Sequence, residues 1–111
     1  MAKLHEITDQ NFKKEVVESK KNWSVTYSAL SYCQPCKVLH KTLENEILKD
    51  DITKAVSFGS VAVEDKGINI SGRAGVRGVP TTILYKNGEP IAQKVGAVPA
   101  SEFIAWVKEN F

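Results

Sequence analysis

The spacing of hydrophobic and polar residues changes several times along this chain, and each change predicts the boundary of a structural element. Runs rich in β-branched and other apolar residues predict strands, at residues 3–7, 23–29, 56–63, 79–85 and 90–95. Apolar residues that recur every three or four positions predict helices, at residues 8–20, 34–47, 67–76 (a weak pattern) and 99–111. The predicted order is therefore β-α-β-α-β-α-β-β-α.

This order predicts an α/β protein built on one central sheet. Strands that alternate with helices are usually parallel, whereas Asn87-Gly88 is a strong turn signal for an antiparallel closing hairpin. Pro90 indicates that the last strand lies at an edge, because proline cannot donate to a neighbouring strand. Thr8 and Asp9 are cap-type residues and are expected to begin the first helix. We expect a mixed sheet of about five strands flanked by four helices.

Composition narrows the class of protein. The chain has 111 residues, of which 42% are hydrophobic and 25% charged, and this predicts a single domain over residues 1–111. The net charge of +2 comes without a cluster of basic residues, so we expect no nucleic-acid partner. No apolar run approaches the ~18 residues of a membrane span, and the first residues lack the apolar region of a secretion signal. We expect a cytoplasmic protein, unless a signal was removed before residue 1.

The candidate reactive residues are the only two cysteines, Cys33 and Cys36, which are predicted to begin the second helix directly after a strand. A helix N-terminus favours an anion, so Cys33 is expected to be exposed, with a lowered pKa, and to attack a substrate disulfide. Cys36 is in register with the buried stripe of the helix, so it is expected to be shielded and to resolve the mixed disulfide. His40 completes a set of three possible metal ligands, but a fourth is missing unless the chain dimerises. We therefore expect no metal.

Four motifs resemble those of the thioredoxin family, in the family's order and spacing over the whole chain. They are Tyr-Cys-Gln-Pro-Cys-Lys (32–37), Val-Arg-Gly-Val-Pro-Thr (76–81), Tyr-Lys-Asn-Gly-Glu (85–89) and Lys-Val-Gly-Ala (94–97). The resemblance implies the thioredoxin fold and thiol-disulfide exchange, with the Cys33–Cys36 disulfide and no bound cofactor. It also implies a monomer that reduces oxidised protein substrates and is recycled by a flavoenzyme similar to thioredoxin reductase.

The resemblance also assigns the residues around the dithiol. It implies a cis peptide bond before Pro80, facing the two cysteines, in a loop that offers backbone hydrogen bonds to an extended substrate. An apolar docking surface would then be framed by Tyr32, Pro35, Val79, Pro80, Gly96 and Ala97. Gln34, Lys37 and Thr26 are expected to modulate the reactivity of the pair.

Several positions depart from the family pattern. Residues 26–29 read Thr-Tyr-Ser-Ala where the family has Asp-Phe-Trp-Ala, so the buried aspartate is replaced by Thr26. The lysine that usually accompanies this aspartate aligns with Val61. The segment 30–31 is one residue longer than usual, and Lys41 replaces the proline that kinks the second helix, which predicts a straighter helix.

These departures lead to two expectations and leave three alternatives open. Without a buried carboxylate nearby, the pKa of Cys33 should fall below that of ordinary thioredoxins, which makes the disulfide more oxidising. Release of the mixed disulfide should also be slower. The alternatives are a specialised or more oxidising protein with one client, a partner-binding module without redox activity, and a metal-bridged dimer.

Overall fold

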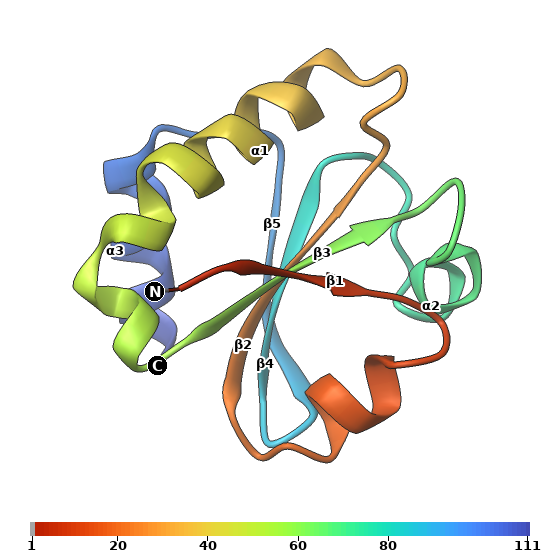
Figure 1. Cartoon of the computed structure of the whole chain (residues 1–111), viewed down its shortest axis with the longest axis horizontal. Helices are drawn as coiled ribbons and strands as arrows, with labels where there is room; N and C mark the ends of the chain where they lie inside the picture. The colour runs from red at the N-terminus through yellow and green to blue at the C-terminus, as the bar shows by residue number, and fades with distance from the viewer. Residues whose placement is uncertain (1) are drawn as a thin grey trace.

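The computed structural model describes residues 2–111 and contains one five-stranded sheet between helices (Figure 1). The strands are β1 (Leu4–Ile7), β2 (Asn22–Ser28), β3 (Ser57–Ala62), β4 (Thr81–Lys86) and β5 (Glu89–Val95). The α-helices are α1 (Gln34–Asn45), α2 (Ile68–Arg73) and α3 (Ala100–Asn110). Three shorter helical turns are η1 (Lys13–Val17), η2 (Ile47–Lys49) and η3 (Asp51–Lys54).

The sheet has the strand order β1-β3-β2-β4-β5. β3 runs parallel to both β1 and β2, whereas β4 is antiparallel to both β2 and β5. The predicted mixed sheet of about five strands is therefore confirmed, and β5 lies at an edge, as Pro90 indicated. The carboxyl end of β2, at the centre of the sheet, leads directly to the two cysteines.

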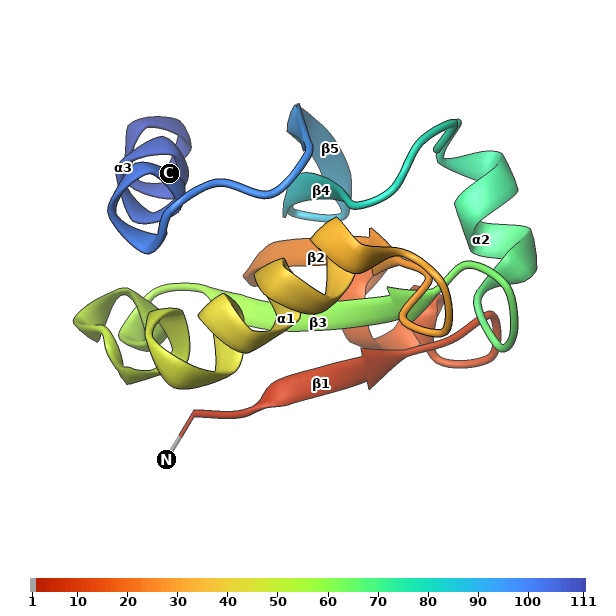
Figure 2. The ribbon, with the colours of Figure 1, turned by 90° about the horizontal axis from the view of Figure 1, so that it is seen from above.

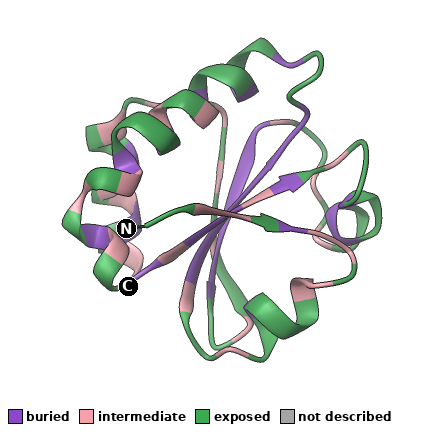
Figure 3. Cartoon of the chain, in the orientation of Figure 1, coloured by how far each residue is buried: buried purple, intermediate pink, exposed green. Residues whose placement is uncertain are grey.

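Helices cover both faces of the sheet, and each face has its own core (Figures 2 and 3). One core lies under α1 and α3 and contains Leu39, Leu43, Ile47, Ile52, Val56, Phe58, Leu84, Phe103 and Val107. The other lies under η1 and α2 and contains Ile7, Val16, Trp23, Val25, Tyr27, Val61, Ile70, Ile83 and Tyr85. Alternate residues of the central strands supply the two cores, because successive side chains of a strand point to opposite faces.

The first helix differs from the prediction. It is a single turn of π-helix rather than a helix up to residue 20, and Lys20 ends the segment in the left-handed region at a φ of +58°. The hydroxyl of Thr8 accepts hydrogen bonds from the backbone N–H groups of Gln10 and Asn11, both at 3.3 Å, and so supports the turn before η1 rather than the helical turn itself. Asp9, however, accepts hydrogen bonds from the backbone N–H of Ile70 at 2.9 Å and of Asn69 at 3.3 Å, and therefore caps α2 instead. The prediction for Asp9 was wrong because its partner lies about sixty residues away along the chain.

Helix α1 runs without interruption through Lys41. The straighter course expected from the missing proline stays a prediction. The helix ends at Asn45, so that Ile47, which was predicted to continue the stripe, lies buried in η2 instead. No helix among residues 2–111 is long and apolar enough to cross a membrane.

Two buried tyrosines are joined across the sheet in the second core. The phenolic oxygens of Tyr27 and Tyr85 lie 2.6 Å apart, and burial raises the pKa of both phenols. Replacing either residue by phenylalanine leaves the other hydroxyl buried without its partner, and should cost about 1–3 kcal/mol. The double variant should lose less free energy of unfolding than the sum of the two single losses. Denaturant unfolding of all four proteins measures this coupling, and additive losses would contradict it.

Candidate active site

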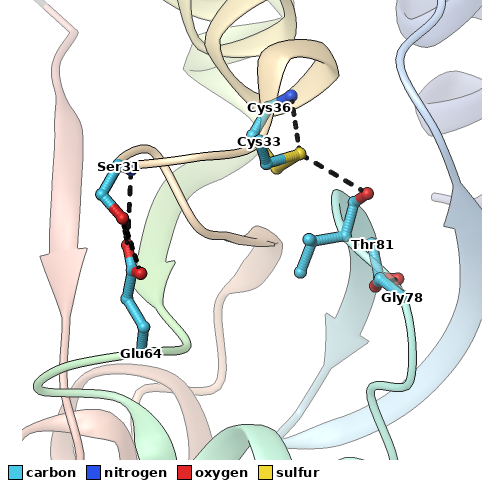
Figure 4. The surroundings of a disulfide bond; sticks show 7 residues. Ser31, Cys33, Cys36, Glu64, Gly78 and Thr81 are labelled. Atoms are coloured by element: carbon cyan, nitrogen blue, oxygen red, sulfur yellow. Dashed lines mark hydrogen bonds between the residues drawn. A yellow bond between two sulfur atoms is a disulfide. The ribbon is translucent and has the colours of Figure 1, made fainter.

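The two cysteines form a disulfide at the junction between β2 and α1 (Figure 4). After β2 the chain turns sharply, because the backbone N–H of Cys33 donates to the carbonyl of Ala29 at 2.9 Å. This turn makes Cys33 the N-cap of α1 and places Cys36 in the helix's first turn, with Pro35 between them. Proline is favoured there because the first N–H groups of a helix have no partner within it.

The sulfur of Cys33 lies where an anion is stabilised. It accepts a hydrogen bond from the backbone N–H of Cys36 at 3.2 Å, and it faces the positive end of the α1 dipole. Both features favour a thiolate at Cys33 once the disulfide is reduced.

Both cysteines are buried, which the sequence predicted for only one of them. Cys33 is 8% exposed and Cys36 is 1% exposed. The expectation of a freely exposed Cys33 was wrong, because the loop before β4 lies against it and the carbonyl oxygen of Val79 is 3.7 Å from its sulfur. The pair also packs against Ala29 and Val63. A substrate sulfur therefore has only restricted access to Cys33.

The loop facing the disulfide is held firmly at both ends. The Val79–Pro80 peptide bond is cis, as the resemblance implied. The carbonyl of Pro80 accepts from the backbone N–H of Gly96 at 2.8 Å, and the hydroxyl of Thr81 donates to the carbonyl of Gly78 at 2.6 Å. These bonds fix the backbone of the loop opposite the sulfurs.

Comparison with known proteins agrees with this geometry. The thioredoxin family model matches residues 3–109. The chain belongs to the thioredoxin family. The thioredoxin of Buchnera aphidicola from Acyrthosiphon pisum is 38% identical over 110 residues, which cover 99% of this chain and 98% of that protein. The crystal structure of a Malassezia sympodialis thioredoxin superposes with a TM-score of 0.86 at 28% identity, covering 99% of this chain and 92% of that one.

Family membership and the joined cysteines together make the protein a thiol-disulfide oxidoreductase. A thioredoxin of Chlorobaculum thiosulfatiphilum is also similar, with 34% identity over 108 residues that cover 97% of this chain and 96% of that protein. The predicted fold and activity class are thus confirmed. The roles of individual residues around the pair stay predictions.

The structure places the predicted docking residues around the disulfide to different depths. Tyr32 is 69% exposed. Pro35 and Ala97 are also exposed, whereas Val79 and Gly96 are half-buried and Pro80 is buried. Pro80 therefore shapes the backbone of this surface more than it adds area to it.

Val95 extends this surface and was missed from the sequence. It is 64% exposed, and it is paired with Thr81 next to the cis peptide bond. The alternation of side chains along the edge strand is the sequence pattern that could have indicated Val95.

The three residues expected to modulate the pair occupy different settings. Gln34 and Lys37 are exposed on α1, and within residues 2–111 neither side chain makes a hydrogen bond or an ion pair. Thr26 is buried in β2, and its partner on β3 is Ser60, not Val61. Val61 points to the opposite face, because a shift of one residue in a strand reverses the side chain. The alignment to Val61 was therefore wrong, but the position beside Thr26 is still uncharged.

A second feature that sequence reasoning missed lies beside the disulfide (Figure 4). The hydroxyl of Ser31 donates to the two carboxylate oxygens of Glu64 at 2.8 and 2.7 Å, and its backbone N–H lies 3.4 Å from one of them. The backbone N–H of Val63 also donates to the carbonyl of Ser28 at 3.0 Å. These bonds tie the segment that leads to Cys33 to the loop after β3. The extra residue at 30–31 was the only sequence signal for this clamp.

Proposed function

We propose that this member of the thioredoxin family reduces disulfides of protein substrates, with Cys33 as nucleophile and Cys36 as resolving thiol. The Cys33 thiolate attacks one sulfur of the substrate disulfide, and the other leaves as a thiolate. Cys36 then loses its proton and attacks the Cys33 sulfur, so that the bond between Cys33 and the substrate breaks. The substrate gains two electrons and two protons, and the chain is left with the Cys33–Cys36 disulfide. The observation that supports this assignment is the amide of Cys36, which donates to the sulfur of Cys33.

We further propose that the substrate docks as an extended segment along the loop before Pro80. The exposed side chains of Tyr32, Val95 and Ala97 supply apolar contact area around the sulfurs. The backbone of Val79 lies against Cys33 and would offer hydrogen bonds to an extended chain, a form of strand addition. Since Cys33 is only 8% exposed, a disulfide in an extended or locally unfolded segment fits this site better than one buried in a rigid surface.

Recycling of the oxidised chain requires an electron donor. We propose a flavoenzyme of the thioredoxin-reductase class, acting on a monomer that carries no cofactor besides its own disulfide. A cytoplasmic location, where such a donor keeps dithiols reduced, fits this role. The electron donor, the monomeric state, the lack of a further cofactor and the cytoplasmic location rest on the family resemblance and stay predictions.

The reduction potential tests the direction of the reaction. Equilibration with a glutathione couple should give a value near or somewhat above −270 mV, which is about the potential of thioredoxin. Catalysed reduction of insulin by dithiothreitol should accompany it. A potential above about −180 mV would mark an oxidant and contradict the reductase assignment.

The uncharged surroundings of Thr26 favour a second candidate, a more oxidising protein dedicated to one client. Neither Thr26 nor Ser60 carries a carboxylate or an amine, so no buried negative charge opposes the Cys33 thiolate. A stabilised thiolate stabilises the reduced form and raises the potential. The same redox equilibration separates this candidate from a general reductant.

The pKa of Cys33 should lie well below the free-cysteine value of about 8.5. The physical reasons are the amide donor from Cys36, the helix N-terminus and the missing carboxylate. Thiolate absorbance of the reduced protein against pH measures it, and alkylation at mildly acid pH should label Cys33 before Cys36. A value at about 8.5 would remove the basis for the more oxidising candidate.

A further inference from the structure

A surface groove runs along one side of α1, between this helix and the edge of the sheet at β1 and β3, with a volume of about 260 Å³. Apolar side chains from three segments line it, namely Leu4 of β1, Leu30 of the segment before Cys33, and Ala62 at the end of β3. Leu30 is 37% exposed and Leu4 is half-buried. The groove, which we call the α1–β1 groove, therefore presents apolar surface to solvent.

The charged side chains that line the α1–β1 groove are mainly acidic. Glu6 comes from β1 and Glu44 from α1, and both are exposed. One carboxylate oxygen of Glu44 lies 3.2 Å from the imidazole Nε2 of His40, whereas Glu6 makes no ion pair within residues 2–111. The two lysines of α1, Lys37 and Lys41, do not line the groove. No lysine or arginine of the described chain thus neutralises these two carboxylates.

The end of the groove nearest the disulfide is held in place by the loop after β3. Leu30 lies between Ser28 and Ser31, and both neighbours are bonded to this loop. The carbonyl of Ser28 accepts from the backbone N–H of Val63 at 3.0 Å. The hydroxyl of Ser31 donates to both carboxylate oxygens of Glu64, at 2.8 and 2.7 Å. The wall of the groove that leads to the first cysteine is therefore fixed before any substrate arrives.

The groove and the loop before β4 lie on different sides of the disulfide. Figure 4 shows the clamp between Ser31 and Glu64 on one side and the loop at Gly78 and Thr81 on the other. A substrate segment that lies along Val79 can therefore continue past the sulfurs toward the α1–β1 groove.

A basic side chain matches the chemistry of this groove. Lysine and arginine lay an aliphatic stem along apolar surface and keep the charged head at its rim. Leu4 and Leu30 offer the apolar surface, and Glu6 and Glu44 offer the opposite charge. An acidic side chain would be repelled, and an apolar one gains nothing from the carboxylates. Residues 2–111 contain no group of three or more side chains that could hold a metal ion.

We propose that the α1–β1 groove binds a lysine or arginine side chain of the protein substrate. The inference rests on the proposed function, and it adds that preferred substrates carry a basic residue near the reactive cysteine. Glu44 lies about 16 Å along α1 from Cys33, at 1.5 Å per residue. An extended chain spans this length in about five residues. The basic residue is therefore expected about three to five residues from the substrate cysteine, because its own long side chain shortens the span.

The test compares short disulfide-bonded peptides that differ only at one position, four residues before or after a cysteine. This position carries arginine, alanine or glutamate. At low salt, one of the arginine peptides should have a kcat/KM about fivefold above that of its alanine counterpart, the upper end of the effect of an exposed ion pair. The gain should lie in KM, and it should shrink as added salt screens the charges. Equal values for the arginine, alanine and glutamate peptides would overturn the proposal.

Charge reversal at the groove provides the second arm of the test. Glu44→Lys should reverse the order, so that the glutamate peptide is reduced with a lower KM than the arginine peptide. Glu6→Gln should weaken the preference for arginine. Glu46→Lys is the matched control, because it changes the net charge equally just past the end of α1 and outside the groove. It should keep the preference for arginine, and an equal reversal in this variant would contradict the assigned site.

A binding measurement separates this proposal from the proposed function. If all the peptides are reduced equally, the reductase assignment stands and the groove proposal fails. If none is reduced, nuclear magnetic resonance titration with an arginine peptide that carries serine in place of its cysteines decides, because it needs no turnover. The backbone signals of Leu30, Ala62 and Glu44 should shift with this peptide and not with its glutamate counterpart. Shifts confined to other residues, or equal shifts with both peptides, would overturn the proposal.

Discussion

Replacing Cys33 by serine should lower the rate of disulfide reduction by about a thousandfold or more, since it removes the only nucleophile that can reach a substrate. Cys36 is not expected to take over, because it is only 1% exposed. Cys36→Ser should behave differently. Its Cys33 thiolate still attacks, but the reaction stops at a mixed disulfide with the substrate. Insulin reduction measures the first effect, and mass spectrometry of the trapped adduct measures the second.

The two serine variants control for each other, because the same atom is replaced at positions three residues apart. Both should fold, since oxygen for sulfur is a small change and neither cysteine belongs to the two large cores of the sheet. Turnover by the Cys33 variant, or trapping by that variant rather than by Cys36→Ser, would reverse the assigned roles. Normal binding of a partner by a Cys33→Ser, Cys36→Ser double variant would instead favour the binding-module alternative.

Replacing Gly88 by alanine should lower the free energy of unfolding by about 2–5 kcal/mol. Gly88 has a φ of +80° in the turn between β4 and β5, where an L-residue costs about 1–2 kcal/mol. A Cβ at this position would also lie 2.5 Å from the backbone oxygen of Val17. Relieving that overlap requires the turn to move away from η1, at a cost of about 1–3 kcal/mol. Denaturant unfolding measures the sum.

Gly75 offers a matched control for this substitution. Its φ of +75° is nearly the same, but a Cβ there would meet no atom within 4 Å. Gly75→Ala should therefore lose only the backbone contribution of about 1–2 kcal/mol. Equal losses in the two variants would mean that the contact with Val17 contributes nothing.

Much of the fold followed from the sequence because local spacing carries it. The switches between strand and helix periodicity placed all five strands and the three α-helices. The predictions that failed concerned contacts between residues that are far apart in the chain. Asp9 looked like a cap for the helix next to it in the chain, and only the packing of α2 against the end of β1 turned its carboxylate to Ile70. The register of β3 was off by one residue, which exchanged Ser60 for Val61.

In the active site, too, the local features were predicted from the sequence and the non-local ones were missed. Cys33 and Cys36 were found because their chemistry depends on three-residue spacing at the start of a helix. The clamp between Ser31 and Glu64 joins residues 33 positions apart, and the hydrogen bond between the hydroxyls of Thr26 and Thr82 joins residues 56 apart. No local pattern relates such partners, because their proximity is set by the pairing of strands.

The sequence by itself thus located the dithiol and predicts which of its two sulfurs reacts first, because a helix N-terminus and a C-x-x-C spacing are local features that need little else. Only the tertiary structure decided how far the pair is open and what surrounds it. The loop before Pro80 lies against Cys33, which is only 8% exposed. The sheet register places hydroxyls, rather than any charged side chain, beside Thr26. Burial and register arise from strands that are distant in the chain, and these two properties set the access to the dithiol and the uncharged surroundings of Thr26.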